Sequence, residues 1–311
     1  MKPNTLNNVA IVILNYNNAN LSIQTTKHLI KDLRELHIII VDNCSKDNSK
    51  EILSNEFYNT ENVHLIFNKT NYGYAHGNNV GIEYAQSMGC IDYVAIMNPD
   101  VLLDVCIIDK LVKALEDDSN IGFITTEVYY NGVYNIPNEC AWRIPTLFEL
   151  VTFCTFLGYI GSHYLTKMGC SYNSQGYYSS DYYKNKRIAL VDAVQGCFFM
   201  GRISTFMLVG KLDENTFLYY EENILASKIK KIGKSNAVLL GNYIHHNHHE
   251  KDVKLIKKTS KIFDMTCLHK SRGYYIKQYS RYSLFTKTAL IAFLKIDYFI
   301  RKIVVSLTFE D

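Results

Sequence analysis

Short apolar runs alternate with longer amphipathic segments through the first 130 residues of the chain. Apolar runs of five or six residues, rich in Val and Ile, are typical of strands buried on both faces. The predicted strands are residues 9–14, 37–41, 63–67, 93–97 and 121–125, and the predicted helices are residues 20–33, 47–57, 77–88 and 104–116. Asn20, Asp47 and Asp104 stand where helix N-caps are expected. This alternation predicts an α/β fold with a mostly parallel sheet and helices on both faces.

The pattern is irregular between residues 129 and 190 and becomes regular again afterwards. The irregular part is polar and aromatic and is interrupted by Gly, which predicts loops and short helices. We then predict a strand at residues 191–200, a helix at 223–232 and a strand at 237–245. The last 60 residues are predicted to form helices.

The composition is that of a globular protein, with 48% hydrophobic and 20% charged residues. A net charge of +3 does not indicate a nucleic-acid partner. The eight cysteines lie far apart without a CxxC pair, and the first apolar run is too short for a secretory signal. We therefore expect a reducing, cytoplasmic location. No run reaches the roughly 18 uninterrupted apolar residues of a membrane span.

The C-terminal tail combines basic and apolar residues. Residues 251–302 contain thirteen Lys and Arg against three Asp. Such a segment can lie on an anionic leaflet at the inner face of a membrane. It can equally form a helix that packs on its own domain, and the sequence leaves both interpretations open.

Three predicted strands run directly into carboxamide or carboxylate residues. These residues are Asn15 and Asn17, then Asp42 and Asn43, then Asn98 and Asp100. Ligands of open α/β sheets bind beyond the carboxyl ends of the strands, so we predict a ligand site at this edge. Any one of these residues can instead be a turn or a helix cap. Asp100 is the natural metal ligand, because one carboxylate can hold Mg²⁺ or Mn²⁺ while substrate phosphates complete the coordination. Asp42 can accept hydrogen bonds from a base or a ribose.

Several motifs between residues 8 and 250 follow one another as in family 2 glycosyltransferases. They are VAIVILNYN at residues 9–17, VDNCSKDNS at 41–49, NYGYAHGNNVG at 71–81, NPD at 98–100, VDAVQGC at 191–197, VGKLDE at 209–214, YEE at 220–222 and IHH at 244–246. The chain most resembles the rhamnosyltransferase-like branch that builds bacterial surface polysaccharides. The resemblance implies a GT-A fold, with a Rossmann-like sheet and a helical C-terminal tail.

The resemblance also implies roles for the candidate residues. Asn15, Asp42 and Asn71 would lie around the nucleotide, Asp100 would hold the metal, and Glu222 would be the base that deprotonates the acceptor. The nucleotide-sugar set is completed by Asn17, Asn43, Gly73, Gly77, Asn78 and Asn98. One base on the face opposite the leaving diphosphate is enough for a single inverting displacement.

Two features of the later motifs leave alternatives open. The family usually has Asp at the base position, whereas this chain has Glu222, which is longer by one methylene. Glu221 and Glu222 can also serve only to stabilise the start of the following helix. Four histidines lie between residues 245 and 249, where the family usually carries one near the metal, and we assign that role to His245.

We therefore predict three segments: a nucleotide-sugar-binding half at residues 1–128, an acceptor-binding half of the same domain at 129–250, and a basic helical tail at 251–311. The expected activity is metal-dependent, inverting transfer of rhamnose or a similar hexose. The donor would be dTDP- or UDP-linked, and the glycan acceptor would be polyprenyl-linked. A catalytically degenerate nucleotide-binding protein remains an alternative. So does a sugar-phosphate nucleotidyltransferase, although it would need a Gly-rich basic loop where this chain has NYNN at 15–18.

Overall fold

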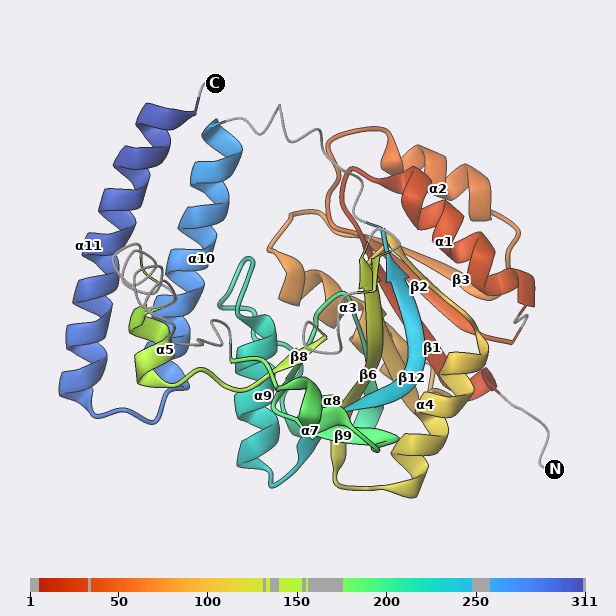
Figure 1. Ribbon diagram of the computed structural model, residues 1–311. Coiled ribbons are helices and arrows are strands. Elements are labelled where there is room, and N and C mark those ends of the chain that lie inside the picture. The colour runs from red at the N-terminus through yellow and green to blue at the C-terminus, as the bar shows by residue number, and fades with distance from the viewer. Residues whose placement is uncertain are drawn as a thin grey trace.

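The computed structural model describes residues 6–32, 35–130, 133–134, 140–152, 155, 176–247 and 258–309. A central sheet lies between two layers of helices, and a helical hairpin stands at one side of this body (Figure 1). A short 3-10 helix, η1 (Leu6–Asn8), leads into the first strand.

The first half of the chain forms the parallel part of the sheet. Its strands are β1 (Val9–Asn15), β2 (His37–Asp42), β3 (Val63–Phe67) and β4 (Tyr93–Met97), in the order β3-β2-β1-β4. All three neighbouring pairs are parallel. β1, β2 and β4 are almost entirely buried, as expected for apolar strands covered on both faces. Each of the four differs from its prediction by no more than one residue.

The second half adds antiparallel strands to the same sheet. β11 (Phe198–Arg202) lies antiparallel between β4 and β6 (Ile121–Tyr130), and β12 (Ser235–His246) runs parallel to β6. β5 (Val101–Leu103) and β9 (Ile188–Val191) pair with β12, and β7 (Val133–Tyr134) pairs with β6. A separate small sheet joins β8 (Ala141–Trp142) to β10 (Ala193–Val194).

The single strand predicted at residues 191–200 is therefore wrong. The segment contributes the end of β9, all of β10 and the start of β11, because each of these strands has a different partner. An apolar run shows that a segment is buried but does not show where its pairing partner changes.

Helices cover both faces of the sheet. α1 (Ala19–Asp32), α2 (Ser49–Phe57) and α4 (Cys106–Asp117) lie on one side, and α3 (Tyr74–Ser87), α8 (Ile203–Leu208) and α9 (Glu221–Lys231) lie on the other (Figure 1). The short helices α5 (Leu147–Thr152) and α7 (Ser180–Tyr183) belong to the variable middle of the chain. Asp47 and Asp104 accept backbone N–H bonds at helix starts, both at 3.0 Å. Asn20 lies inside α1, so its predicted capping role is wrong, because the helix begins one residue earlier.

The hairpin consists of α10 (Lys258–Gln278) and α11 (Leu284–Thr308). Its inner residues form a second hydrophobic cluster with the body, made of Leu150, Tyr220, Ile224, Tyr275, Ile276, Leu290 and Leu294. Among the described residues, no helix is long and apolar enough to cross a membrane. The segment boundaries at residues 128 and 250 stay predictions, and the first of them falls within β6.

Candidate active site

The carboxyl ends of β1 and β2 meet at one edge of the sheet, where their polar residues form a hydrogen-bonded network. Asn15 Nδ2 donates to Asp42 Oδ2 at 3.0 Å, and Ser22 Oγ donates to Asn15 Oδ1 at 2.8 Å. The other oxygen of Asp42 accepts from the Ser45 amide at 3.0 Å. Asn15 and Asp42 are buried. Asp42 therefore supports the loop after β2 and does not cap α2.

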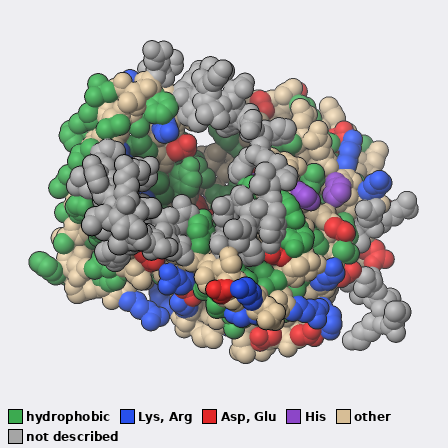
Figure 2. Space-filling model, in the orientation of Figure 1, with side chains coloured by type: hydrophobic (Ala, Val, Ile, Leu, Met, Phe, Trp, Pro, Cys, Tyr) green, Lys and Arg blue, Asp and Glu red, His purple; other side chains and the backbone are tan. Residues whose placement is uncertain are grey.

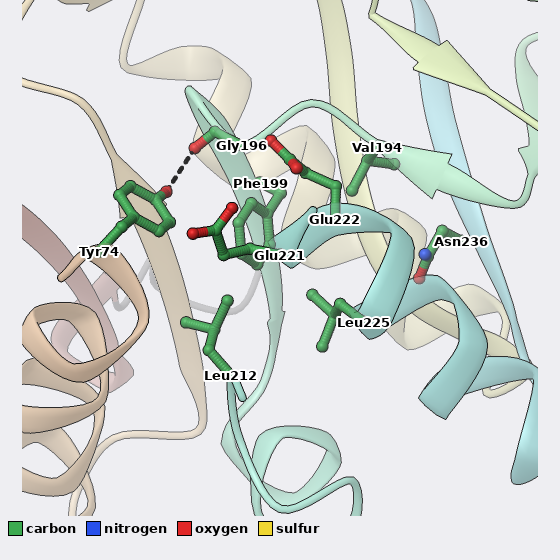
Figure 3. Close-up of a pocket in the computed structure, with 9 residues that line it drawn as sticks. All are labelled: Tyr74, Val194, Gly196, Phe199, Leu212, Glu221, Glu222, Leu225 and Asn236. Atoms are coloured by element: carbon green, nitrogen blue, oxygen red, sulfur yellow. Dashed lines mark hydrogen bonds between the residues drawn. The ribbon is translucent and has the colours of Figure 1, made fainter. Parts of the chain in front are cut away.

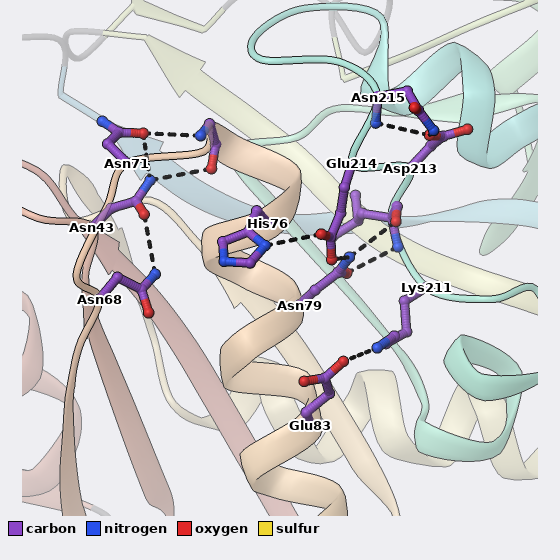
Figure 4. Close-up of polar contacts among 12 residues, drawn as sticks. Asn43, Asn68, Asn71, His76, Asn79, Glu83, Lys211, Asp213, Glu214 and Asn215 are labelled. Carbon is purple, nitrogen blue, oxygen red and sulfur yellow. Dashed lines mark hydrogen bonds and ion pairs between the residues drawn. The ribbon is translucent and has the colours of Figure 1, made fainter.

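A second network lies next to the first and brings together three predicted nucleotide-binding residues (Figure 4). Asn43 Nδ2 donates to Asn71 Oδ1 at 2.9 Å and to the Gly73 carbonyl at 3.1 Å. Asn71 Oδ1 also accepts from the Gly73 amide at 2.9 Å, and Asn68 Nδ2 donates to Asn43 Oδ1 at 3.1 Å. Asn43 and Asn71 thus fix the loop that leads into α3.

The solvent-facing surface of this edge carries exposed aromatic rings. Tyr16 is 45% exposed and Tyr72 is 60% exposed. Asn17, which directly follows Tyr16, is exposed and accepts a hydrogen bond from the Lys46 amide at 2.7 Å. An exposed ring beside amide groups is suited to stacking against a base. Neither Tyr16 nor Tyr72 belongs to the residues predicted from the sequence to bind the nucleotide sugar.

Close packing requires glycine at residues 73 and 77, at the start of α3, independently of any ligand. Gly73 has a left-handed backbone with φ of 98°, and a Cβ there would lie 2.3 Å from the Phe217 carbonyl oxygen. A Cβ at Gly77 would lie 2.3 Å from Leu14 Cδ1. Asn78 is fully buried and donates to the Tyr74 carbonyl at 3.0 Å. Nucleotide contact stays a prediction for Gly73, Gly77 and Asn78.

The candidate metal ligands meet where β5 pairs with β12. Asp100 Oδ1 lies 3.2 Å from His246 Nε2, and the two side chains are 19% and 4% exposed. His245 points to the other side of β12, where it is exposed and stacks on Tyr129 with ring centroids 5.3 Å apart. Because neighbouring residues of a strand face opposite sides, His246 and not His245 reaches Asp100. His248 and His249 lie outside the described residues.

The donor set at this place fits a hard divalent cation. Among the described residues, no group of three or more His, Cys, Asp and Glu could hold a metal ion, so the described protein atoms alone would not complete its coordination. A carboxylate beside an imidazole suits Mn²⁺ well and Mg²⁺ less well, with substrate phosphates and water as the remaining ligands.

A short segment at residues 196–198 joins this corner to the candidate base. The Asn98 amide, two residues before Asp100, donates to the Cys197 carbonyl at 2.8 Å. Burial raises the pKa of the Cys197 thiol, and the nearby carboxylates of Asp100 and Glu222 raise that pKa further. Cys197 therefore lies within electrostatic reach of both carboxylates.

The candidate base lies in a small pocket at the start of α9 (Figure 3). Its lining residues are Tyr74, Val194, Gly196, Phe199, Leu212, Glu221, Glu222, Leu225 and Asn236. Tyr219 and Tyr220 both have left-handed backbones, with φ of 72° and 70°, and this turn directs Glu221 and Glu222 into the pocket. Tyr74 Oη donates to the Gly196 carbonyl at 2.7 Å, a contact between α3 and the pocket that sequence patterns do not reveal.

Burial changes the proton affinity of both carboxylates. Burial raises the pKa of Glu222 above its usual range, and hydrogen bonds from its own amide and the Gly196 amide oppose this rise. Burial and the charge of Glu222 raise the pKa of Glu221 to about 8. A raised pKa makes a carboxylate a stronger proton acceptor. The same residues also lie at the positive end of the α9 dipole, so their position alone is compatible with helix stabilisation.

The single tryptophan of the chain lies beside this pocket. Trp142 Nε1 donates to Asn223 Oδ1 at 2.7 Å, and Asn223 directly follows Glu222 in α9. The Trp142 side chain is half-buried. An indole that is fixed by its N–H while part of its ring stays accessible is suited to a sugar contact.

Comparisons with known proteins show the family of this chain. The family model described as glycosyl transferase family 2 matches residues 10–192. The chain is 26% identical over 219 residues to the low-salt glycan biosynthesis hexosyltransferase Agl10 of Haloferax volcanii, a match that covers 70% of this chain and 60% of that protein. It is 22% identical over 241 residues to the rhamnosyltransferase WbbL of Escherichia coli, which covers 69% of this chain and 84% of that protein.

Two solved structures share the fold. The mannosyltransferase PcManGT of Pyrobaculum calidifontis, in complex with GDP-Man and Mn²⁺, has a TM-score of 0.57 at 13% identity, covering 96% of this chain and 73% of that chain. GalNAc-T7 with UDP, GalNAc and Mn²⁺ has a TM-score of 0.60 at 15% identity, covering 99% of this chain and 58% of that chain. The predicted GT-A fold is confirmed.

Proposed function

We propose, from the premise that the chain belongs to glycosyl transferase family 2, that it moves one sugar with inversion from a nucleoside diphosphate donor to a hydroxyl of a glycan acceptor. Residues 196–198 carry the proposal. At one end of this segment the Cys197 carbonyl accepts from the amide of Asn98, two residues before Asp100, and at the other end the Gly196 amide donates to Glu222. Asp100 in turn lies beside His246. An inverting displacement needs the leaving group and the base on opposite sides of the sugar, and a sugar bound between Asp100 and Glu222 would meet this need.

The proposed reaction has a single step at the sugar. Glu222 accepts the proton of the acceptor hydroxyl while that oxygen bonds to the anomeric carbon. The bond between the anomeric carbon and the diphosphate oxygen breaks at the same time, and its electron pair leaves with the diphosphate. Asp100 and His246 would hold Mn²⁺ or Mg²⁺, which when bound neutralises charge on the diphosphate.

The donor side of the proposal rests on the networks at the ends of β1 and β2. Asn15, Asp42 and Asn71 shape the edge on which the nucleotide would lie, and Tyr16 or Tyr72 would stack on its base. The neighbouring structures hold GDP-Man and UDP with GalNAc, and the relatives are named a hexosyltransferase and a rhamnosyltransferase. The names of the two relatives support rhamnose or a similar hexose as the sugar, and the dTDP- or UDP-linked form of the donor is part of the proposal.

The acceptor side would lie between Glu222 and Trp142. A sugar that rests against the indole would place a hydroxyl near the Glu222 carboxylate, because Asn223 links the two residues. A polyprenyl-linked glycan acceptor and a cytoplasmic location at the inner face of a membrane are further parts of the proposal.

The test begins with a screen of nucleotide sugars by thermal shift in Mn²⁺. A donor at 100 times its dissociation constant stabilises the fold by about 2.7 kcal/mol. Hydrolysis and transfer of the bound donor are then measured with and without EDTA, for the wild type and for Asp100→Ala. His245→Ala is the matched control, because His245 lies on the other side of β12. A chain that binds a donor but never hydrolyses or transfers it is a nucleotide-binding protein and not an enzyme.

A further inference from the structure

Helix α11 exposes a continuous apolar stripe along its outer face. The stripe consists of residues three or four positions apart, all exposed: Phe285, Ala289, Ala292, Ile296, Phe299, Ile303 and Leu307. This spacing places them on one side of a helix. The largest members are far from buried, with Phe285 83%, Phe299 64% and Leu307 80% exposed. We call these seven residues the outer stripe.

The outer stripe is not the face that holds the hairpin together. Leu290, Leu294, Asp297 and Val305 are the buried residues of α11, and their spacing places them on the opposite side of the helix. The Asp297 carboxylate accepts from Arg301 Nε at 2.8 Å on that inner side. α11 is the outermost element of this side of the molecule (Figure 1), and hydrophobic side chains gather on the surface there (Figure 2).

The hairpin that carries the stripe is strongly basic. Residues 258–309 hold ten Lys and Arg against two Asp, a net charge of +8. The other residues of the chain hold 23 Lys and Arg against 28 Asp and Glu, a net charge of −5. Lys295 and Lys302 are exposed next to the stripe. Lys277 and Lys287 line a groove at the turn of the hairpin together with Leu284, which is 81% exposed.

We propose that the outer stripe docks on an anionic membrane surface, with α11 lying along the headgroup region. Apolar side chains flanked by lysines are the pattern of a helix that binds such an interface. A second copy of the chain is the poorer occupant, because stripe-to-stripe pairing would bring two hairpins of charge +8 together.

Docking at this surface would also orient the candidate active site. The α10 side of the hairpin is tied to the segment that leads to the base. Ser271 Oγ donates to the Leu218 carbonyl at 2.7 Å, and Arg272 Nε donates to Tyr220 Oη at 3.1 Å. Tyr220 directly precedes Glu221 and Glu222. This part of the inference rests on the proposed function: the hairpin would set the base segment at a fixed orientation to the bilayer that carries a lipid-linked acceptor.

The test measures sedimentation of the full chain with vesicles of phosphatidylcholine containing 30% phosphatidylglycerol, and with pure phosphatidylcholine. The variant replaces Ile296 and Phe299 by Ser, and the control replaces Leu190 and Leu208 by Ser, which are 46% and 64% exposed on the body. Each stripe residue lost from the interface costs about tenfold in partitioning. We therefore expect the stripe variant to bind anionic vesicles at least tenfold more weakly and the control to bind within twofold of wild type. Wild-type binding should be weaker to neutral vesicles and should fall as NaCl is raised.

The docking proposal is overturned if the wild type does not bind anionic vesicles, and also by either of two further outcomes. One is equal binding of the stripe variant and the wild type to anionic vesicles. The other is a wild type that binds no vesicles and is a dimer by light scattering, while the stripe variant is a monomer. That result would make a second copy of the chain the occupant of the stripe. Donor hydrolysis separates this proposal from the function. If the wild type hydrolyses donor but does not bind vesicles, only the docking proposal fails. If it binds vesicles through the stripe but never hydrolyses donor, only the proposed function fails.

Discussion

Gly196 leaves the space that the Glu222 carboxylate occupies, and this gives a sharp test of the proposed base. A Cβ on residue 196 would lie 2.6 Å from Glu222 Oε1, whereas ordinary contacts begin near 3.4 Å. Gly196→Ala therefore requires the carboxylate to move by about 0.8 Å. The obstructing atom is the end of a flexible side chain, and Gly196 is not among the glycines with positive φ, so the fold should tolerate the methyl group.

We expect Gly196→Ala to lower kcat by about 10²-fold, because a displacement near 1 Å costs about that much. This loss lies within the 10²–10⁴-fold that general base catalysis contributes. Donor affinity by calorimetry and the Tm should stay close to wild type. Gly273→Ala in α10 is the matched control, because nothing lies within 4 Å of its added Cβ. It should keep kcat and gain about 0.5–1 kcal/mol of stability from helix propensity.

The double variant Gly196→Ala, Glu222→Gln shows whether both changes act on one group. If Gly196→Ala acts by moving the base, the double variant should be no slower than Glu222→Gln alone. A folded Gly196→Ala protein with wild-type kcat would refute the placement of Glu222 at the reacting hydroxyl. A fully additive double variant would mean that residue 196 acts by another route.

The remaining predictions concern the metal corner and the two carboxylates. In Mn²⁺, Asp100→Ala and His246→Ala should each lower the rate of sugar transfer at least 10²-fold, whereas His245→Ala should stay within twofold of the wild-type rate. Full wild-type activity in excess EDTA would contradict the metal proposal. Glu222→Gln should lower kcat by about 10²–10⁴-fold with donor affinity nearly unchanged. Because burial raises the pKa of Glu222, wild-type kcat/KM should fall as the pH drops through that raised pKa, and the variant should lack this acid limb. Because its raised pKa keeps Glu221 protonated in the folded state while the unfolded chain ionises, Glu221 lowers the stability as the pH rises from about 4.5 to about 8, so Glu221→Gln should show no stability gain below pH 4.5. Above pH 8 we expect a gain of about 1–3 kcal/mol by thermal unfolding, below the ceiling of about 5 kcal/mol that this pKa shift sets.

The parallel half of the sheet was predictable because its signal is local. The residues of β1, β2 and β4 are apolar in unbroken runs, since both faces of these strands are buried. Asn15 and Asp42 could be placed side by side for the same reason, because parallel neighbours end at one edge. The register Asn15↔Asp42 in the structure agrees with this expectation.

The contacts that complete the site were not predictable, because they join segments far apart in the sequence. Tyr74 at the start of α3 meets Gly196 between β10 and β11, and Trp142 of β8 meets Asn223 in the first turn of α9. A tyrosine inside a Gly-rich motif and a tryptophan in an irregular region carry no periodic signal. Only the packing of the two halves gives these residues their positions.

The sequence could not predict which of His245 and His246 faces Asp100. The motif placed the two residues at the metal corner, but the choice between them depends on which face of β12 turns toward Asp100. The face that turns toward Asp100 is set by the pairing of β12 with β5, in which His246 lies opposite Val101. Because Val101 directly follows Asp100, the Asp100 carboxylate lies on the His246 side. A shift of one residue would exchange the two imidazoles. The register is itself fixed by a strand of only three residues, Val101–Leu103, whose pairing no local pattern predicts. The metal proposal therefore moves to His246 on the strength of a strand that the sequence did not reveal.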